Sequence, residues 1–240
     1  ERMKEIPDNS VDMVLADPPY GTTNNKWDSI IPLEPMWEQL KRIIKPKGAI
    51  VLTSQTPFDK VLGASNLPML KYEWIWEKTA ATGHLNAKKM PMKAHENTLV
   101  FSDDDAEHCN MMVFYKKLPT YNPQKTEGHK PVNSFNKNSD SWNYGKQRPV
   151  SGGGNTDRSP RSVIIFASDK QKSKLHPTQK PVALGEYLIE TYTNEGDTVV
   201  DFCYGSGSFG VAAKNLKRRF IGIEKEVDIF NTGKARIEAA

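Results

Sequence analysis

Short apolar runs and helical periodicities alternate at both ends of the chain. An apolar run bounded by polar residues predicts a buried strand, whereas apolar residues that repeat every three or four positions predict a helix. Strands are expected at 11–16, 49–53, 72–76, 97–101, 163–166, 198–203 and 220–223. Helices are expected at 33–44, 57–64, 182–193, 209–216 and 227–237, with Pro46, Lys47 and Gly48 ending the first of them. This alternation predicts an α/β fold with a mostly parallel, doubly wound sheet.

The middle of the chain breaks this alternation. Residues 120–161 are rich in Asn, Pro, Ser, Gly and Lys, and such a run is too long for an ordinary connection. We therefore expect residues 1–102 and 176–240 to form one domain, with residues 103–175 as an irregular insertion. The strand expected at 163–166 would belong to that insertion.

Positive charge is concentrated in the same region. From residue 114 to residue 174, nine Lys and three Arg stand against four acidic residues, although the formal charge of the whole chain is only +4. A basic segment on an otherwise acidic body is typical of a protein that binds a polyanion. A solvated loop would have the same composition, so charge alone leaves both interpretations open.

The composition argues against a membrane protein, since no apolar run approaches the roughly 20 residues that cross a bilayer. Only two cysteines occur, Cys109 and Cys203, far apart and without a C-x-x-C pair. This predicts a protein of the reducing cytoplasm with neither a disulfide framework nor a metal site. The chain starts at Glu1 and not at Met, so we expect natural residues to precede it.

A glycine-rich turn follows the strand expected at 198–203. Gly205 and Gly207 precede a helix, and Glu224 stands at the end of the next strand, 19 residues after Gly205. Glycines let a backbone bend sharply and approach a ligand, while a terminal acid accepts hydrogen bonds from ribose hydroxyls. Because Ser208 and Phe209 follow Gly207 directly, we take the loop to lack the third glycine of the dinucleotide fingerprint. A ligand with adenosine and ribose but without phosphate, such as S-adenosylmethionine, then fits better.

The tetrapeptide Asp17-Pro18-Pro19-Tyr20 follows the strand expected at 11–16. Ligands of doubly wound sheets bind at the carboxyl ends of strands. Two prolines stiffen the turn and remove two backbone donors, which leaves a carboxylate, carbonyl oxygens and an aromatic ring. This set suits an aromatic amine such as that of adenine, because Asp17 and the Pro18 carbonyl can accept its hydrogens while Tyr20 stacks on the base. An ordinary turn would also use Asp and Pro, so the tetrapeptide alone leaves both interpretations open.

Taken together, these motifs resemble the β class of amino-methyltransferases that act on DNA. In that class the DPPY segment comes first, a target-recognition region follows and the cofactor-binding half comes last. The same permuted order occurs here, with residues 103–175 in the place of the target-recognition region. Three further segments look like the family: Ile6 to Asp12, Lys93 to Phe101, and His176 to Pro181. The resemblance implies a Rossmann-like methyltransferase fold, S-adenosylmethionine as cofactor and the N6 amine of adenine as methyl acceptor.

The resemblance also implies roles for single residues. Asp17, Pro18, Pro19 and Tyr20 would be catalytic and hold a base flipped out of double-stranded DNA. The cofactor-binding residues would be Asp17, Thr178, Gln179, Lys180, Asp201, Phe202, Gly205, Ser206, Gly207, Ser208, Glu224 and Lys225. Where the commoner loop has Pro-Phe, this chain has Phe202-Cys203-Tyr204, and Ser208 replaces the usual Thr.

DNA contacts are expected from the basic insertion, whose aromatic residues could stack on bases while its cations neutralise phosphates. The DNA-binding residues would be Lys116, Lys117, Lys125, Lys130, Lys137, Trp142, Tyr144, Lys146, Arg148, Arg158 and Arg161. The family resemblance further allows a homodimer and a restriction endonuclease partner, in the cytoplasm of a bacterium or encoded by a phage.

Three other functions remain open from the residues alone. A cytosine-N4 or RNA methyltransferase would share the fold, although DPPY favours adenine. An NAD-dependent oxidoreductase would explain the glycine loop and Glu224 but not DPPY. A non-catalytic DNA-binding protein would keep the fold without transferring a methyl group.

Overall fold

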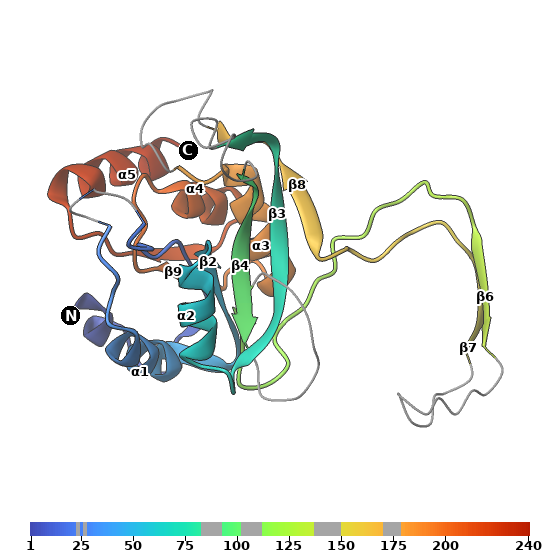
Figure 1. Cartoon of the computed structure of the whole chain (residues 1–240), viewed down its shortest axis with the longest axis horizontal. Coiled ribbons are helices and arrows are strands. Elements are labelled where there is room, and N and C mark those ends of the chain that lie inside the picture. Colours follow the sequence, from blue (N-terminus) through green and yellow to red (C-terminus); the bar gives the residue numbers. More distant parts are fainter. Residues whose placement is uncertain (23–24, 26–27, 83–92, 102–111, 137–149, 170–178) are drawn as a thin grey trace. The chain divides into compact units, whose positions relative to one another are not determined.

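The computed structural model describes residues 1–22, 25, 28–82, 93–101, 112–136, 150–169 and 179–240 (Figure 1). Two compact units result. The larger one joins Glu1–Asn122 to Ser162–Ala240, and the smaller one is Pro123–Arg161. In the described residues, no helix is long and apolar enough to cross a membrane.

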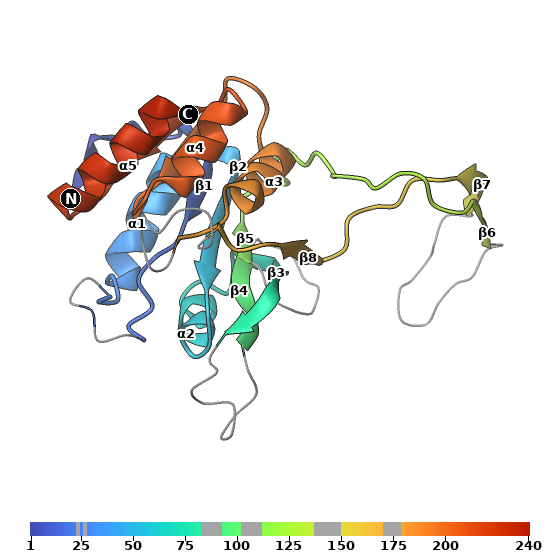
Figure 2. The same cartoon turned by 90° about the horizontal axis from the view of Figure 1, so that it is seen from above.

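The larger unit is one mixed sheet with helices on both faces. Its strands are β1 (Val11–Ala16), β2 (Ile44–Ser54), β3 (Leu70–Thr82), β4 (Lys93–Phe101), β5 (Met112–Phe114), β8 (Val163–Phe166), β9 (Thr198–Asp201) and β10 (Arg219–Gly222). Its helices are a short 3-10 turn (Arg2–Glu5), α1 (Leu33–Ile43), α2 (Phe58–Ala64), α3 (Val182–Tyr192), α4 (Ser208–Asn215) and α5 (Val227–Ala239). Figure 2 shows α3, α4 and α5 on one side of the sheet and α1 and α2 on the other.

The strand order brings the two ends of the chain together. The order is β10-β9-β1-β2-β4-β3-β5, with β8 beside β3. The four strands from β10 to β2 are parallel, and Met13 and Val14 of β1 pair with Val199 and Val200 of β9. Beyond β2 the pairs are antiparallel, except that β8 runs parallel to β3. The carboxyl ends of β1 and β9, which carry the two predicted motifs, therefore meet at one edge of the sheet.

The central strands form because both of their faces are covered. All four residues of β9 and five of the six residues of β1 are buried. Such double burial explains why both segments read as unbroken apolar runs instead of alternating patterns. Burial of each aliphatic side chain stabilises the folded state by about 1.5–3 kcal/mol. The two strands that carry the motifs are therefore firmly held in the sheet.

The structure corrects the expected end of the first helix. Helix α1 ends at Ile43, and β2 begins at Ile44, so Pro46, Lys47 and Gly48 lie within a strand. Val11 pairs with Ile44 whereas Met13 pairs with Ala49, so residues 45–48 of β2 form a bulge opposite Asp12. A bulge tolerates proline because no ladder hydrogen bond is needed there. The Lys45 ammonium holds it by contacting both Asp12 oxygens, at 2.7 and 2.8 Å.

The expected strand at 163–166 is present, but it pairs with β3 of the main sheet, and β5 also joins that sheet. The smaller unit is therefore shorter than the predicted insertion at 103–175. It contains an antiparallel hairpin of β6 (Val132–Asn136) and β7 (Val150–Asn155) and a bridge between Thr126 and Arg158. That residues 103–175 recognise the target stays a prediction.

Candidate active site

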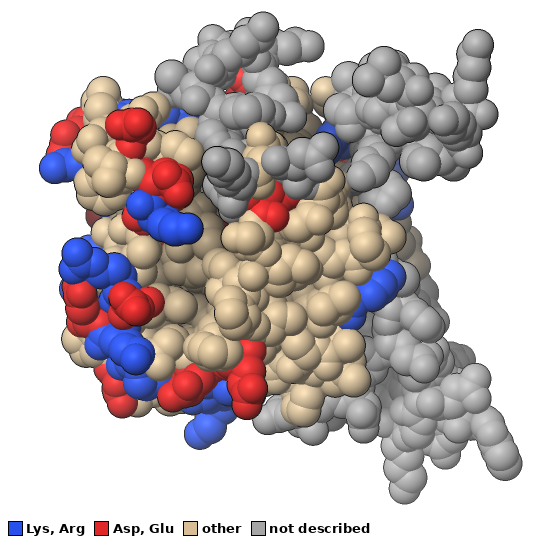
Figure 3. Space-filling model, turned by 60° about the vertical axis from the view of Figure 1, so that its left-hand side comes forward, with Lys and Arg blue, Asp and Glu red and all other residues tan. Residues whose placement is uncertain are grey.

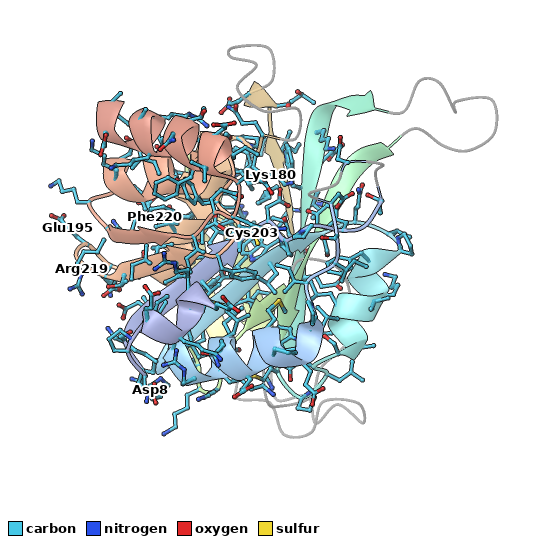
Figure 4. The ribbon with its side chains drawn as sticks, turned by 90° about the vertical axis from the view of Figure 1, so that its left-hand side faces the viewer. Asp8, Lys180, Glu195, Cys203, Arg219 and Phe220 are labelled. Carbon is cyan, nitrogen blue, oxygen red and sulfur yellow. The ribbon has the colours of Figure 1, made fainter. Side chains whose placement is uncertain are left out.

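A cavity of about 350 Å³ lies where β1 and β9 end, a size typical of small-molecule sites. Both motifs line it, as do residues just before α3. Of the predicted site residues, the cavity is lined by Asp17, Pro18, Pro19, Tyr20, Gln179, Lys180, Asp201, Phe202, Gly205, Ser206, Ser208, Glu224 and Lys225. Lys180 and Cys203, which both line the cavity, lie in the interior in Figure 4, whereas Glu195 and Arg219 point outward at the edge.

The glycine loop bends through backbone conformations that side chains disfavour. Gly205 and Gly207 have φ values of +52° and +77°. A Cβ on Gly207 would come within 2.9 Å of the Gly233 carbonyl oxygen, so α5 also requires glycine there. Gly207 directly precedes α4 and is its N-cap residue.

Glu224 is tied to this loop. Its Oε2 accepts a hydrogen bond from the Gly205 backbone N–H at 3.0 Å, and its Oε1 accepts the N–H groups of Lys225 and Glu226 at 2.7 and 3.0 Å. The carboxylate is thereby fixed between the glycine loop and the start of α5, inside the cavity lining. An acid held in this place is positioned for ribose hydroxyls.

The sequence interpretation of the loop is wrong in one respect. Gly210 stands three residues after Gly207, so the chain does carry a G-x-G-x-x-G spacing. A Cβ on Gly210 would lie 2.3 Å from Ile237 Cδ1 and 2.8 Å from the Phe220 ring. Gly210 therefore permits close packing of α4 on α5 and β10. The loop alone does not separate a dinucleotide from an adenosine ligand.

Asp17 is the centre of a polar network in the lining of the same cavity. Its Oδ2 accepts a hydrogen bond from the Lys180 ammonium at 2.6 Å, and its Oδ1 accepts the hydroxyls of Tyr20 and Thr53. Lys180 is buried and Asp17 is largely buried, with side-chain exposures of 8% and 22%. The carboxylate of the DPPY segment is thus oriented by three groups before any ligand is considered.

Tyr20 is held both through its hydroxyl, which donates to Asp17, and through its ring. Its ring stacks on Phe58, with centroids 5.6 Å apart and an interplanar angle of 29°, and the Lys180 ammonium lies 5.7 Å from its ring centroid. Tyr20 also lines the cavity. An aromatic ring held in this way offers a stacking surface for a planar base.

Comparison with known proteins identifies the family that uses these motifs. The chain matches the family model described as DNA methylase (N6_N4_Mtase) over residues 11–235. The chain belongs to this DNA methylase family.

Two relatives of the methylase extend over most of its length. Type II methyltransferase M.HpaI of Haemophilus parainfluenzae is 27% identical over 253 residues, covering 99% of this chain and 71% of that protein. Type II methyltransferase M2.DpnII of Streptococcus pneumoniae is 25% identical over 263 residues, covering 99% and 86%.

Solved structures agree with the observed fold. The M1.HpyAVI–SAM complex superposes with a TM-score of 0.61 at 25% identity, covering 98% of this chain and 92% of that one. The cytosine-N4-specific PvuII DNA methyltransferase superposes with a TM-score of 0.65 at 14% identity, covering 98% and 82%. The latter shows the fold alone. The predicted Rossmann-like methyltransferase fold is confirmed.

Two titratable groups just before the glycine loop, the Asp201 carboxyl and the Cys203 thiol, stay neutral more readily than usual. Burial raises the pKa of the Asp201 carboxyl well above its usual range, the Cys203 backbone N–H at 3.0 Å opposes this, and the charges of Asp17 and Glu224 raise it further. Burial likewise raises the pKa of the Cys203 thiol, with the nearby carboxylates adding to the effect. A neutral thiol is a weak nucleophile, so Cys203 is not suited to covalent catalysis.

The predicted DNA-binding residues divide between described and undescribed segments. Lys116, Lys117, Lys125, Lys130 and Arg161 are exposed, and Arg158 is half-buried. In the smaller unit, Lys125 forms an ion pair with Asp157 at 2.6 Å and Arg158 donates to the Lys130 carbonyl oxygen at 2.5 Å. Outside the described residues lie Lys137, Trp142, Tyr144, Lys146, Arg148 and the cofactor-site prediction Thr178.

Several residues at the site were not predicted. Arg236 of α5 donates to the Ser206 carbonyl oxygen at 3.1 Å and to Ser208 Oγ at 3.0 Å, so both serines hold the loop as well as lining the cavity. Asp28 accepts the Gly21 and Thr22 N–H groups at 2.8 and 2.9 Å and fixes the segment after DPPY. Further unpredicted lining residues include Gln55, Trp76, Lys78 and Ser168. The sequence gives no local signal for Arg236, because only the packing of α5 brings it to the loop.

Tyr204 explains the departure from the commoner loop sequence. Its hydroxyl donates to the Phe230 carbonyl oxygen at 2.6 Å, and its ring meets Phe220 and Phe230 edge-on. A Cβ on Gly233 would lie 2.5 Å from that ring. Tyr204 thus anchors α5 beside the loop, and the changed residue serves packing.

Proposed function

We propose that this DNA methylase transfers a methyl group from S-adenosylmethionine to the N6 amine of adenine in double-stranded DNA. The observation that carries the proposal is the single cavity that joins the Asp17 carboxylate to the glycine loop and Glu224. A methyl donor and an acceptor amine must meet in one site, and the two motifs supply complementary halves of it. Family membership supports the same reaction class.

The cavity residues fit the cofactor. Gln179 is buried at 4% exposure, and neither its amide nitrogen nor its amide oxygen has a partner among the described residues. An amide buried without partners is costly, which points to a polar ligand that supplies them. Glu224 would hold the ribose, and Gln179, Lys180 and Thr178 would hold the amino-acid end. Asp201, Phe202, Ser206, Ser208 and Lys225 would line the space between them.

When bound, S-adenosylmethionine supplies a methyl group on a positively charged sulfonium with a good leaving group. The protein's task is then to position the acceptor amine. A carboxylate has about four acceptor sites, and three groups already occupy Asp17. One site remains for a hydrogen of the target amine, which would turn the nitrogen lone pair toward the methyl group.

Duplex DNA cannot place an amine in this cavity unless the base is flipped out, at a cost of a few kcal/mol. The excess of positive charge between residues 114 and 174 would offset that cost through phosphate contacts. On the face drawn in Figure 3, described cations and anions alternate without forming a patch of one sign. We assign DNA binding to the basic residues 116–161, including those outside the described segments, because this part of the chain carries the excess of positive charge.

Cytosine-N4 methylation is the second candidate, because the family model covers N6 and N4 enzymes and the PvuII methyltransferase has the same fold. The DPPY segment favours adenine. We also propose that the methylase acts in the bacterial cytoplasm and serves a restriction–modification system, as the Type II names of its relatives suggest. A homodimer remains a proposal from the family resemblance.

The test is incubation of the purified protein with unmethylated duplex DNA and S-adenosylmethionine, followed by mass spectrometry of the nucleosides. We expect N6-methyldeoxyadenosine as the product. N4-methyldeoxycytidine alone would overturn the choice of adenine, and binding of DNA without any methylated nucleoside would overturn the proposed enzyme activity.

Cofactor affinity should depend on pH through Asp201. Because its pKa is raised, this carboxyl stays protonated in the free protein at pH values where an ordinary carboxyl is ionised, whereas a cationic ligand favours the ionised form. Binding therefore releases a proton. Between the pKa of the bound protein and the higher pKa of the free protein, affinity rises with pH by up to about tenfold per pH unit. Calorimetry in two buffers of different ionisation enthalpy measures the released proton. Asp201→Asn should lose it, and equal proton release by this variant and the native protein would contradict the prediction.

A further inference from the structure

We propose that Thr53 is a positioning residue of the methylation reaction, acting through the Asp17 carboxylate. The inference rests on the proposed function and adds to it a residue that no motif of the DPPY segment or the glycine loop contains. Thr53 lies at the end of β2, and Ala16 pairs with Leu52 in the parallel β1–β2 register. The residue after each partner is therefore Asp17 on one strand and Thr53 on the other.

The contacts of Thr53 point at the reacting end of the site. Its side chain is buried, with 1% of the residue exposed. Its hydroxyl donates to Asp17 Oδ1 and lies 2.8 Å from the Tyr20 hydroxyl oxygen. The Tyr20 hydroxyl donates to the same Asp17 oxygen. Two hydroxyls on neighbouring elements thus converge on one carboxylate oxygen.

This convergence fixes the direction of the other oxygen. Oδ1 accepts two hydroxyls, whereas Oδ2 accepts only the Lys180 ammonium among these contacts, so the acceptor site left for the amine is on Oδ2. A carboxylate held at only one oxygen can rotate about its Cβ–Cγ bond, which is a broad torsion in free side chains. Because Thr53 and Tyr20 both donate to Oδ1, the carboxylate is held in one orientation, and its remaining acceptor site points in one fixed direction. Thr53 is not among the described residues that line the cavity, so we expect it to govern the rate of transfer through Asp17 and not through contact with substrate or cofactor.

The two hydroxyls should act as one unit. Removal of either leaves the other on Oδ1, so the second removal costs more than the first, and the two losses do not add independently. A hydrogen bond to a charged group is strong enough that its loss slows a positioned reaction roughly tenfold. Affinity for S-adenosylmethionine should stay unchanged, because Lys180 still holds Asp17 at Oδ2, and none of the described contacts of Thr53 involves Lys180, the glycine loop or Glu224.

The experiment compares Thr53→Val, Thr53→Ser and Tyr20→Phe on unmethylated duplex DNA of mixed sequence. The single-turnover rate of methyl transfer and the dissociation constant of S-adenosylmethionine are both measured. We expect Thr53→Val to slow transfer about tenfold with unchanged cofactor affinity, and Thr53→Ser to restore the rate to within about twofold of native. The double variant Thr53→Val/Tyr20→Phe should be slower than the product of the single effects.

A matched control is Thr191→Val, which removes another buried hydroxyl, one that donates to the Tyr187 carbonyl oxygen within α3. It should leave the rate and the cofactor affinity as in the native protein. A native rate in Thr53→Val, a parallel loss of cofactor affinity, or a Ser variant as slow as Val would each overturn the positioning role. Should Thr53→Val not fold, Thr53→Ala against Thr53→Ser makes the same comparison. If the native protein itself binds the cofactor but transfers no methyl group, the proposed function fails first and this inference falls with it.

Discussion

Asp17→Ala should reduce methyl transfer by about 10³-fold, the loss expected when a group that orients charge at the reacting centre is removed. The variant lacks the acceptor for the target amine, and it also releases Tyr20, Thr53 and Lys180, which all contact that carboxylate. Single-turnover kinetics with tritiated S-adenosylmethionine and unmethylated DNA measure the rate. DNA binding should persist, because phosphate contacts are assigned to other residues.

The matched control for this variant is Asp8→Ala. Asp8 is an exposed carboxylate whose described ion pair is with Arg42, outside the cavity. It should keep the native rate. Retention of more than a tenth of the native rate in Asp17→Ala would contradict the catalytic assignment of the DPPY carboxylate.

Lys180→Met should destabilise the protein and also slow methyl transfer. Removing one partner of a buried ion pair leaves the other charge without compensation, a cost of about 3–5 kcal/mol for fully buried pairs. Asp17 is partly exposed and keeps two hydroxyl donors, so we expect about 2 kcal/mol. Urea unfolding followed by circular dichroism measures this loss.

The double variant Asp17→Asn/Lys180→Met separates the two effects of the ion pair. Without either charge, the desolvation penalty disappears, and stability should return to within about 1 kcal/mol of native. Methyl transfer should remain as low as in Asp17→Asn alone. Additive losses of stability in the double variant would mean that the Lys180–Asp17 contact carries little energy.

The sequence indicated the two motifs of the site because each is local. DPPY and the glycine loop each follow a buried apolar strand, so their placement at strand ends could be predicted from short segments. That these ends meet follows from the pairing of β1 with β9, which the family resemblance implied and the structure confirms. The same local character explains why α1, α3 and α5 were found close to their observed limits.

Contacts that depend on packing could not be predicted in this way. Thr53 is a polar residue at the end of an otherwise apolar run, and only the β1–β2 register shows that it reaches Asp17. Arg236 reaches the loop because α5 packs against it at Gly207 and Gly233. Gly210, by contrast, is visible in the sequence, and the prediction of a loop without a third glycine was wrong.

The pairing of β1 with β9 has a consequence for how this enzyme can diverge. The two halves of the chemistry are joined by backbone hydrogen bonds between adjacent strands. The chain between them contributes β2, β3, β4, β5 and β8 to the same sheet and, in addition, the separate unit Pro123–Arg161. That separate unit can change in length and side chains without altering the paired strands that carry the two motifs. Because we propose that this region binds DNA, we expect the choice of DNA sequence to vary from one descendant to another while the reaction itself is inherited unchanged.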